Sequence, residues 1–157
     1  MDLGLKGKVA LVTGSSGGIG LVIAQLLAKE GVEVIIHGKN PSKVFAVAIK
    51  IWKETGNKVH RLEADATKLE QIKRWFAIEM PKIGRLDILV NNLGGIAGIK
   101  KFEEISDQEW YDSFTFNFMS AVRFTRLALP YLKKSDQARI INLGTAQVVQ
   151  PGFNSPQ

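Results

Sequence analysis

The stretch that decides the fold is Thr13-Gly14-Ser15-Ser16-Gly17-Gly18-Ile19-Gly20. It follows residues 8–12, a short apolar run with β-branched residues that is typical of a buried parallel strand. It precedes residues 21–30, whose pattern predicts a helix that ends at Gly31. Glycines let such a turn approach a pyrophosphate closely, and the helix N-terminus offers unpaired N–H groups to that anion. The stretch therefore predicts the first part of a dinucleotide site, although a glycine-rich turn also serves simply to join a strand to a helix.

Length and composition favour one soluble domain. A chain of 157 residues suits a single domain with a sizeable core. Its apolar runs are shorter than the roughly 18 residues of a membrane span, and its first residues show no signal-peptide pattern. We therefore expect no membrane partner and a cytoplasmic location. The sequence has no cysteine and only two histidines, His37 and His60, which argues against a zinc site, so no metal is predicted.

The net charge of +6 comes from 21 basic and 15 acidic residues. A basic balance is one signature of nucleic-acid binding. Here the basic residues are scattered, with no more than two adjacent to one another. The sequence therefore indicates a solvated basic surface and no nucleic-acid partner. The positive electrostatic field of such a surface also favours an anionic cofactor.

Strand and helix patterns alternate along the whole chain, which predicts an α/β fold with helices on both faces of a parallel sheet. Thr67 with Glu70, and Ser106 with Glu109, have the spacing of a capping box at a helix start. We expect a single domain over residues 1–157, with a Rossmann-like doubly wound sheet in the strand order 3-2-1-4-5. The expected strands are residues 8–12, 32–37, 58–63, 86–90 and 139–143, and the expected helices are 21–30, 41–54, 68–80 and a long, bent helix over 107–133.

Three segments carry a resemblance to a known family. Thr13-Gly14-x-x-x-Gly18-Ile19-Gly20 resembles the cofactor motif of the short-chain dehydrogenase/reductase family, which includes the 3-oxoacyl-acyl-carrier-protein reductases. Asn91-Asn92-Leu93-Gly94 resembles the family's Asn-Asn-Ala-Gly motif, with Leu93 in place of Ala. Ile140-Ile141-Asn142-Leu143-Gly144-Thr145 resembles the strand-five segment that ends in the family's catalytic Ser. The likeness covers essentially the whole chain in the right order.

The resemblance implies an oxidoreductase that transfers hydride between a nicotinamide and a small carbonyl or alcohol substrate. It implies that Asn117 and Thr145 are catalytic, with the Thr145 hydroxyl holding the carbonyl and Asn117 carrying a proton relay. It places Asp65 against the adenine. The cofactor contacts that we expect are Gly14, Ser15, Ser16, Gly18, Ile19, Gly20, Lys39, Asp65, Ala66, Asn91, Asn92 and Gly94.

Two departures from the family pattern affect these expectations. Thr145 stands where the family usually has Ser, which keeps the hydroxyl and adds a methyl group. The family's catalytic Tyr would fall one residue after Gln157, with its Lys four residues beyond that. We therefore expect the chain to be the N-terminal part of a longer enzyme, lacking its proton donor and the last strands. The alternative is a non-catalytic nucleotide-binding or interaction module.

Several candidate residues also have a purely structural interpretation. Asn117 could be a buried amide bonded to its own helix backbone, and Thr145 a turn hydroxyl at the end of a strand. Asp65 could cap the following helix through the N–H groups near Thr67. Asn91 and Asn92 could mainly tie the fourth strand to its neighbours, which would leave the cofactor to the loop backbone.

Cofactor choice depends on the end of the second strand, His37-Gly38-Lys39-Asn40. An NAD site typically has an acidic residue about 20 positions beyond the glycine motif, which bonds the ribose 2′-hydroxyl. This segment has no carboxylate, and Lys39 could pair with the 2′-phosphate of NADP. The sequence therefore favours NADP over NAD. Gly17 counts against this preference, because many NADP enzymes of the family carry Arg there, and Lys39 could also be an exposed loop lysine.

The long helix predicted over residues 107–133 is rich in phenylalanine, at positions 114, 116, 118 and 124. A broadly apolar helix is either buried or part of an interface. The family commonly pairs this helix across a dimer axis, so the resemblance implies a homodimer or homotetramer through residues 107–133.

Overall fold

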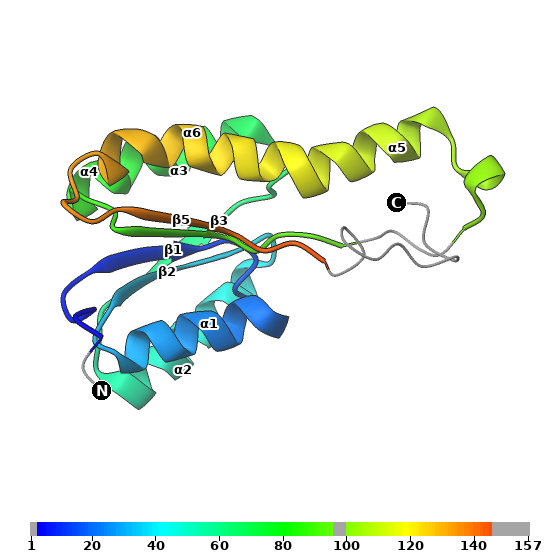
Figure 1. Cartoon of the computed structure of the whole chain (residues 1–157). Helices are drawn as coiled ribbons and strands as arrows, with labels where there is room; N and C mark the ends of the chain where they lie inside the picture. The colour runs from blue at the N-terminus through cyan, green and yellow to red at the C-terminus, as the bar shows by residue number, and fades with distance from the viewer. Residues whose placement is uncertain (1–2, 96–99, 146–157) are drawn as a thin grey trace.

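The computed structural model describes residues 3–95 and 100–145, which form a five-stranded sheet with helices on both faces (Figure 1). The strands lie in the order β3-β2-β1-β4-β5, and every neighbouring pair is parallel. This order confirms the predicted doubly wound, Rossmann-like class. The strands are β1 (Val9–Val12), β2 (Glu33–Gly38), β3 (Val59–Glu63), β4 (Ile88–Asn91) and β5 (Arg139–Asn142).

The helices divide between the two faces of the sheet (Figure 1). One face carries α1 (Gly18–Lys29) and α2 (Pro41–Thr55). The opposite face carries α3 (Leu69–Ile78), α4 (Met80–Ile83), α5 (Asp107–Phe114) and α6 (Ser120–Leu132). A single 3₁₀ turn, η1 (Phe102–Glu104), precedes α5, and a turn of π-helix, η2 (Thr115–Met119), joins α5 to α6.

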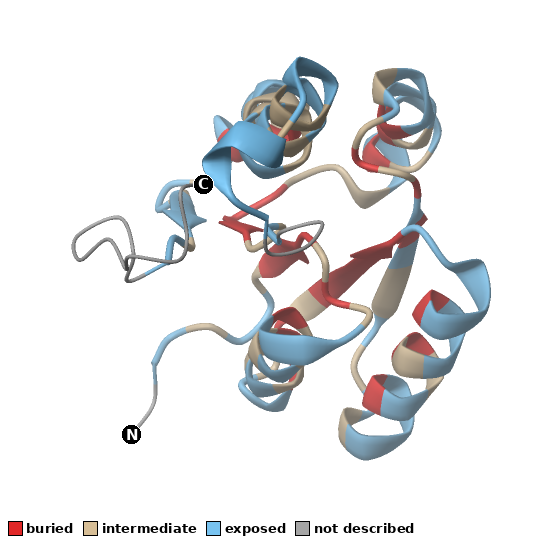
Figure 2. Ribbon diagram, turned by 90° about the vertical axis from the view of Figure 1, so that its right-hand side faces the viewer, coloured by how far each residue is buried: buried red, intermediate tan, exposed pale blue. Residues whose placement is uncertain are grey.

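Successive side chains of the central strands point to opposite faces of the sheet and pack into two separate hydrophobic cores. Leu11 packs with Phe124 of α6 on one face, whereas Val12 packs with Ala24 of α1 on the other. Figure 2 shows the buried residues gathered in the central strands and on the helix surfaces that face them. Because both faces of the sheet are covered, the strands read in the sequence as continuous apolar runs.

The helix after β3 starts later than the sequence predicted. Its N-cap is Lys68, which makes no capping bond through its side chain, so the expected Thr67 capping box with Glu70 is wrong. The Thr67 hydroxyl and N–H instead both donate to Asp65 Oδ1, over 2.7 and 2.9 Å, so Thr67 belongs to the turn before the helix. The expected single helix to residue 80 is also divided, because α3 ends at Ile78 and Pro81 lies in the first turn of α4, where its missing N–H costs nothing.

The long helix starts as predicted and changes its hydrogen-bonding pattern midway. Ser106 and Glu109 form the expected capping box, with the Ser106 hydroxyl accepting from the Glu109 N–H and the Glu109 carboxylate accepting from the Ser106 N–H. The π-helical turn η2 then interrupts the α-helix, which resumes in α6. Such turns in α-helices frequently mark functional positions, and Asn117 lies in this one.

The edge strand β5 is open to solvent along its length. All four of its residues are exposed, and the Ile141 side chain is 48% exposed. An exposed apolar edge strand is a site where other chains can pair, so β5 is the least protected part of the described sheet.

Candidate functional site

The glycine turn after β1 leads directly into α1. Gly14 and Gly18 have φ angles of +66° and +56°, a left-handed region that side chains disfavour. Gly17 is the N-cap of α1, and within the described residues no side chain caps this helix start. The first N–H groups of α1 and the positive end of its dipole are therefore available to an anion. This geometry fits a bound diphosphate.

The turn packs tightly against the segment that follows β4. A Cβ atom on Gly20 would lie only 2.7 Å from the Gly14 carbonyl oxygen, so a side chain at this position would push α1 away from the turn. The Asn92 side-chain amide lies against the same point, and it donates to the Thr13 carbonyl over 2.9 Å. The start of α1, the turn and the β4 loop thus form one packed unit.

The two serines of the turn differ in their burial. The Ser15 hydroxyl is buried, donates to the Val12 carbonyl over 2.7 Å and accepts from the His37 N–H over 2.9 Å. The Ser16 side chain lies against Gly38, where a Cβ atom would come within 2.8 Å of the Ser16 Cβ. Ile19, in contrast, is 67% exposed. Of the side chains that the sequence predicted here, Ser15 is therefore engaged within the protein, whereas the half-buried Ser16 and the exposed Ile19 lie at the surface of the turn with its backbone groups.

His37, near the end of β2, is a site residue that the sequence analysis did not identify. Its ring is 1% exposed and is hydrogen-bonded at both nitrogens, to the Gly14 N–H and to the Ala64 carbonyl. Burial lowers the pKa of His37 to about 4, against the opposing effects of the Ala64 bond and the Asp65 charge. A titratable residue at the carboxyl end of a buried strand, beside the glycine motif, is the signal that could have identified it.

Lys39 and Asp65 lie at the carboxyl ends of the neighbouring strands β2 and β3. Lys39 is exposed, and Asn40 after it caps α2 by accepting from the Lys43 N–H over 3.1 Å. Partial burial raises the pKa of Asp65, but hydrogen bonds from Thr67 and the charges of Lys39 and Lys68 outweigh it and leave the pKa below its usual value. The Asp65 carboxylate is therefore ionised and close enough to Lys39 to respond to its charge.

The Asp65 carboxylate closes the turn that leads to α3, accepting from the Thr67 N–H over 2.9 Å. This is the capping interpretation that the sequence left open, with the correction that the N-cap itself is Lys68. The Ala66 side chain is buried, so only the backbone of that residue could meet a ligand. Arg123 of α6 donates to the carbonyls of Ala66 and Thr67 over 3.1 and 3.0 Å, a contact that the sequence analysis missed.

The two asparagines at the carboxyl end of β4, Asn91 within the strand and Asn92 after it, tie that strand to its neighbours, which is the structural role that the sequence left open for them. Asn91 is buried and donates to Thr125 Oγ1 over 3.1 Å and to Asn142 Oδ1 over 2.8 Å, joining β4 to α6 and β5. Asn92 bonds back to Thr13 through both its backbone and its side chain. Their side-chain Nδ2 groups thus hold the carboxyl ends of β1, β4 and β5 together and are occupied in doing so.

Asn117 connects the π-helical turn to the glycines after β4. Its Oδ1 accepts from the Gly95 N–H over 2.8 Å, and its Nδ2 donates to the Gly95 and Ser113 carbonyls over 3.0 Å each. A Cβ atom on Gly94 would lie 3.4 Å from the same Oδ1. Asn117 is exposed rather than buried, and it bonds both its own helix and the loop. Thr145 is exposed and follows β5 by three residues, at the end of the described part of the chain.

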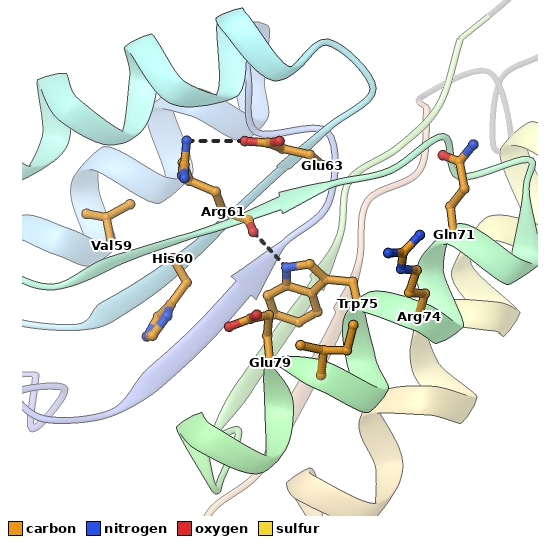
Figure 3. Close-up of a pocket in the computed structure, with 9 residues that line it drawn as sticks. Val59, His60, Arg61, Glu63, Gln71, Arg74, Trp75 and Glu79 are labelled. Atoms are coloured by element: carbon orange, nitrogen blue, oxygen red, sulfur yellow. Dashed lines mark hydrogen bonds and ion pairs between the residues drawn. The ribbon is translucent and has the colours of Figure 1, made fainter.

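The structure thus brings the predicted cofactor residues to one edge of the sheet, at the carboxyl ends of β1 to β4. A hollow of about 580 Å³ lies elsewhere, between the edge strand β3 and α3 (Figure 3). It is lined by Arg61, Arg74 and Trp75 among others and contains none of the predicted site residues. The Trp75 indole donates to the Arg61 carbonyl over 2.7 Å there, and Arg61 pairs with Glu63 at 3.4 Å (Figure 3).

Residues 3–95 and 100–145 show neither a membrane span nor a metal site. No helix in these ranges is both long and apolar enough to cross a membrane. The same ranges hold no group of three or more histidine or acidic side chains placed to bind a metal ion.

Comparisons with known proteins agree with this fold. The family model for short chain dehydrogenase matches residues 8–156. The D-beta-hydroxybutyrate dehydrogenase of Cupriavidus necator is 38% identical over 141 residues, which is 90% of this chain and 54% of that protein. The structure of L-sorbose reductase from Gluconobacter frateurii, complexed with NADPH and L-sorbose, matches with a TM-score of 0.93 and 31% identity, over 99% of this chain and 59% of that one. An NADH-dependent reductase responsible for alginate metabolism matches with a TM-score of 0.86 and 30% identity, over 95% of this chain and 63% of that one.

The parallel sheet and its two helical layers define a Rossmann-like α/β protein. The family model is more specific, and the chain belongs to the short-chain dehydrogenase family of oxidoreductases. The chain spans about half the length of the curated relatives it matches, 56% and 54% for two of them.

Proposed function

We propose that this chain is the nicotinamide-nucleotide-binding part of an oxidoreductase acting on a small carbonyl or alcohol substrate, with NADP preferred over NAD. The observation that carries the proposal is the glycine turn, whose uncapped helix start and left-handed glycines lie beside Lys39 and Asp65 at one sheet edge. When bound, the nicotinamide supplies or accepts the hydride. We expect the protein itself to lie in the cytoplasm, which cell fractionation can test.

In this proposal, backbone groups of the chain make most of the contacts to the nucleotide. The N–H groups at the start of α1, around Gly18, Ile19 and Gly20, bind the diphosphate. Asp65 and the Ala66 backbone contact the adenine, and the loop at Asn91, Asn92 and Gly94 borders the ribose. The exposed Ile19 side chain excludes water from the bound nucleotide. The Ser15, Asn91 and Asn92 side chains support this division, because their hydrogen bonds are made within the protein.

The preference for NADP rests on Lys39. It is exposed, its charge acts on Asp65 at the same end of the site, and the segment 37–40 has no carboxylate that would repel a 2′-phosphate. The solved structures that resemble this chain include one protein complexed with NADPH and one described as NADH-dependent, so they favour neither nucleotide. The observation that supports NADP is therefore the positive charge of Lys39. A phosphate–ammonium contact is charge-assisted and favours the phosphorylated nucleotide.

The test compares NADPH and NADH binding by calorimetry and by the shift in Tm. We expect NADPH to bind about tenfold more tightly, and Lys39→Ala to remove most of that difference, since one charge-assisted contact is lost. Lys53→Ala, in the last turn of α2, makes the same change in net charge away from the site and should leave the preference intact. Tighter binding of NADH by the wild-type chain would overturn the NADP preference.

For the chemistry, we propose that the Thr145 hydroxyl holds the substrate oxygen and that Asn117 passes a proton through water. Asn117 already bonds the Gly95 backbone and the helix, which fixes its amide beside the loop after β4. The two tyrosines are poorly placed to donate a proton, because Tyr111 is 69% exposed on α5 and Tyr131 packs against the core. We expect residues 1–157 alone to bind the nucleotide without reducing a carbonyl, and measurable turnover would contradict this.

We also propose self-association through the long helix, as a homodimer or homotetramer. Phe114 and Phe118 are 54% and 55% exposed and stack on each other with ring centroids 5.0 Å apart. Phe124, in contrast, is fully buried in the core. An exposed aromatic pair on one helix is a common centre of a protein interface.

A further inference from the structure

One peptide unit at the end of β1 is held at both of its ends by side chains from the neighbouring strands. The Thr13 carbonyl accepts from Asn92 Nδ2 over 2.9 Å, and the Gly14 N–H donates to His37 Nδ1 over 3.0 Å. β1 lies between β2 and β4 in the sheet, so one side chain reaches the peptide from each side. The Thr13–Gly14 peptide is therefore clamped across the sheet at the residue where the glycine turn begins.

The surroundings of His37 permit only one form of its ring. A backbone N–H can only donate, so Nδ1 must be unprotonated, and the Ala64 carbonyl can only accept, so Nε2 must carry the hydrogen of its 3.1 Å bond. The ring also meets Phe124 edge-on, with centroids 4.8 Å apart. Its orientation and tautomer are thus fixed by groups from the glycine turn, the segment after β3 and α6.

The orientation of the clamped peptide determines the course of the turn. Gly14 has a φ of +66°, and a Cβ atom there would lie 3.0 Å from the Leu93 side chain, so the turn can follow this path only with glycine at position 14. The backbone groups that follow, up to the start of α1, take their direction from this residue. A turn that is fixed before a ligand arrives loses less conformational freedom on binding.

We propose that His37 is a positioning residue for the nucleotide, acting through the Gly14 N–H to preorganise the glycine turn. The proposal rests on the proposed function in that the ligand is a nicotinamide nucleotide. It assigns the effect to one ring nitrogen: Nδ1, which bonds the turn, matters for the nucleotide, whereas Nε2, which bonds Ala64, serves only the packing of β2 against β3.

Two substitutions separate the roles of the two nitrogens. In His37→Asn, the side-chain oxygen occupies the place of Nδ1 and can accept from the Gly14 N–H, while the bond to Ala64 is lost. In His37→Gln, the amide nitrogen reaches the place of Nε2 and can donate to Ala64, while the bond to Gly14 is lost. Both variants remove the ring from Phe124, so each serves as the control for the other.

We expect His37→Asn to bind NADPH within about threefold of the wild-type chain and His37→Gln to bind about tenfold more weakly, since one hydrogen bond to the turn is lost. Binding is measured by calorimetry at a temperature where circular dichroism shows both variants folded. Equal loss in the two variants, or a larger loss in His37→Asn, would overturn the proposal and leave His37 as a packing residue.

A second readout needs no nucleotide. We expect hydrogen exchange of the Gly14 amide, followed by NMR, to remain slow in His37→Asn and to become faster in His37→Gln, by about tenfold. Equal exchange in both variants would contradict the clamp directly. If the wild-type chain binds no nicotinamide nucleotide, the proposed function fails, and the Gly14 exchange rates still decide whether the clamp exists.

Discussion

At the scale of single residues, His37 connects the ionisation of a buried group to the stability of the whole chain. Its pKa falls from the usual 6.5 to about 4, chiefly because burial disfavours the charged ring. Below pH 6.5 the unfolded chain takes up a proton at this residue, whereas the folded chain does not until about pH 4. The stability that the neutral ring contributes is therefore complete above pH 6.5 and declines as the pH falls toward 4.

We predict that the free energy of unfolding, measured with urea, is lower near pH 5 than near pH 7.5 by about 2 kcal/mol from this residue alone. The full difference between the two pKa values corresponds to about 3 kcal/mol, of which most is reached by about pH 5. His37→Asn has no titrating group at this position and keeps His60, so it should lose most of the pH difference. An unchanged difference in that variant would assign the effect to other groups.

At the scale of elements, the same sequence pattern succeeded at one helix and failed at another. Ser106 with Glu109 predicted the start of α5 correctly, because the Ser106 hydroxyl and the Glu109 carboxylate accept from each other's backbone N–H groups. Thr67 with Glu70 has the same spacing, but the Thr67 N–H and hydroxyl both donate to Asp65, which holds Thr67 in the turn before α3, and α3 begins at Leu69. A carboxylate two residues upstream that closes a turn on the expected N-cap competes with a helix start at that residue. The π-helical turn at Asn117 had no such local signal beyond an expected bend.

Trp75 covers part of the exposed backbone of the edge strand β3. β3 is an edge strand, and the Trp75 indole of α3 covers its Arg61 carbonyl with a 2.7 Å hydrogen bond (Figure 3). We predict that Trp75→Phe, which keeps an aromatic ring and loses the donor, lowers the free energy of unfolding by about 1 kcal/mol in urea titrations. It should also increase light scattering on heating, because the edge is less well covered.

Trp52→Phe is the matched control for this change. Trp52 lies on α2 and is 53% exposed, so its substitution removes the same atoms from a more exposed position. We expect it to change the free energy of unfolding by less than about 0.5 kcal/mol. Equal effects of the two substitutions would show that the indole bond to β3 contributes nothing measurable.

At the scale of the whole molecule, the sequence was sufficient for the strand order and for the edge at which the candidate site lies. Alternating strands and helices fix which ends of parallel strands meet, and so bring Gly14, Lys39, Asp65 and Asn92 to one edge. The sequence was not sufficient to predict which hydrogen bonds each side chain makes. The inward bonds of Ser15 and the clamp by His37 join residues more than 20 positions apart, and their partners are defined only once the strands are in register.

Self-association belongs to this largest scale, because it depends on surfaces that the monomer leaves uncovered. We predict that the chain sediments as a dimer or larger assembly at micromolar concentration and that Phe118→Glu weakens the association at least about tenfold, since it places a charge in the centre of the proposed interface. Phe45→Glu, at a 51% exposed position on α2 across the sheet, is the control and should leave the assembly intact (Figure 1). A wild-type chain that sediments as a monomer would contradict the self-association, and equal dissociation by both substitutions would place the interface elsewhere. Because the Phe114–Phe118 pair adjoins the turn that holds Asn117, the Phe118→Glu variant should also be assayed for NADPH binding, and unchanged affinity would show that the nucleotide site forms within one chain.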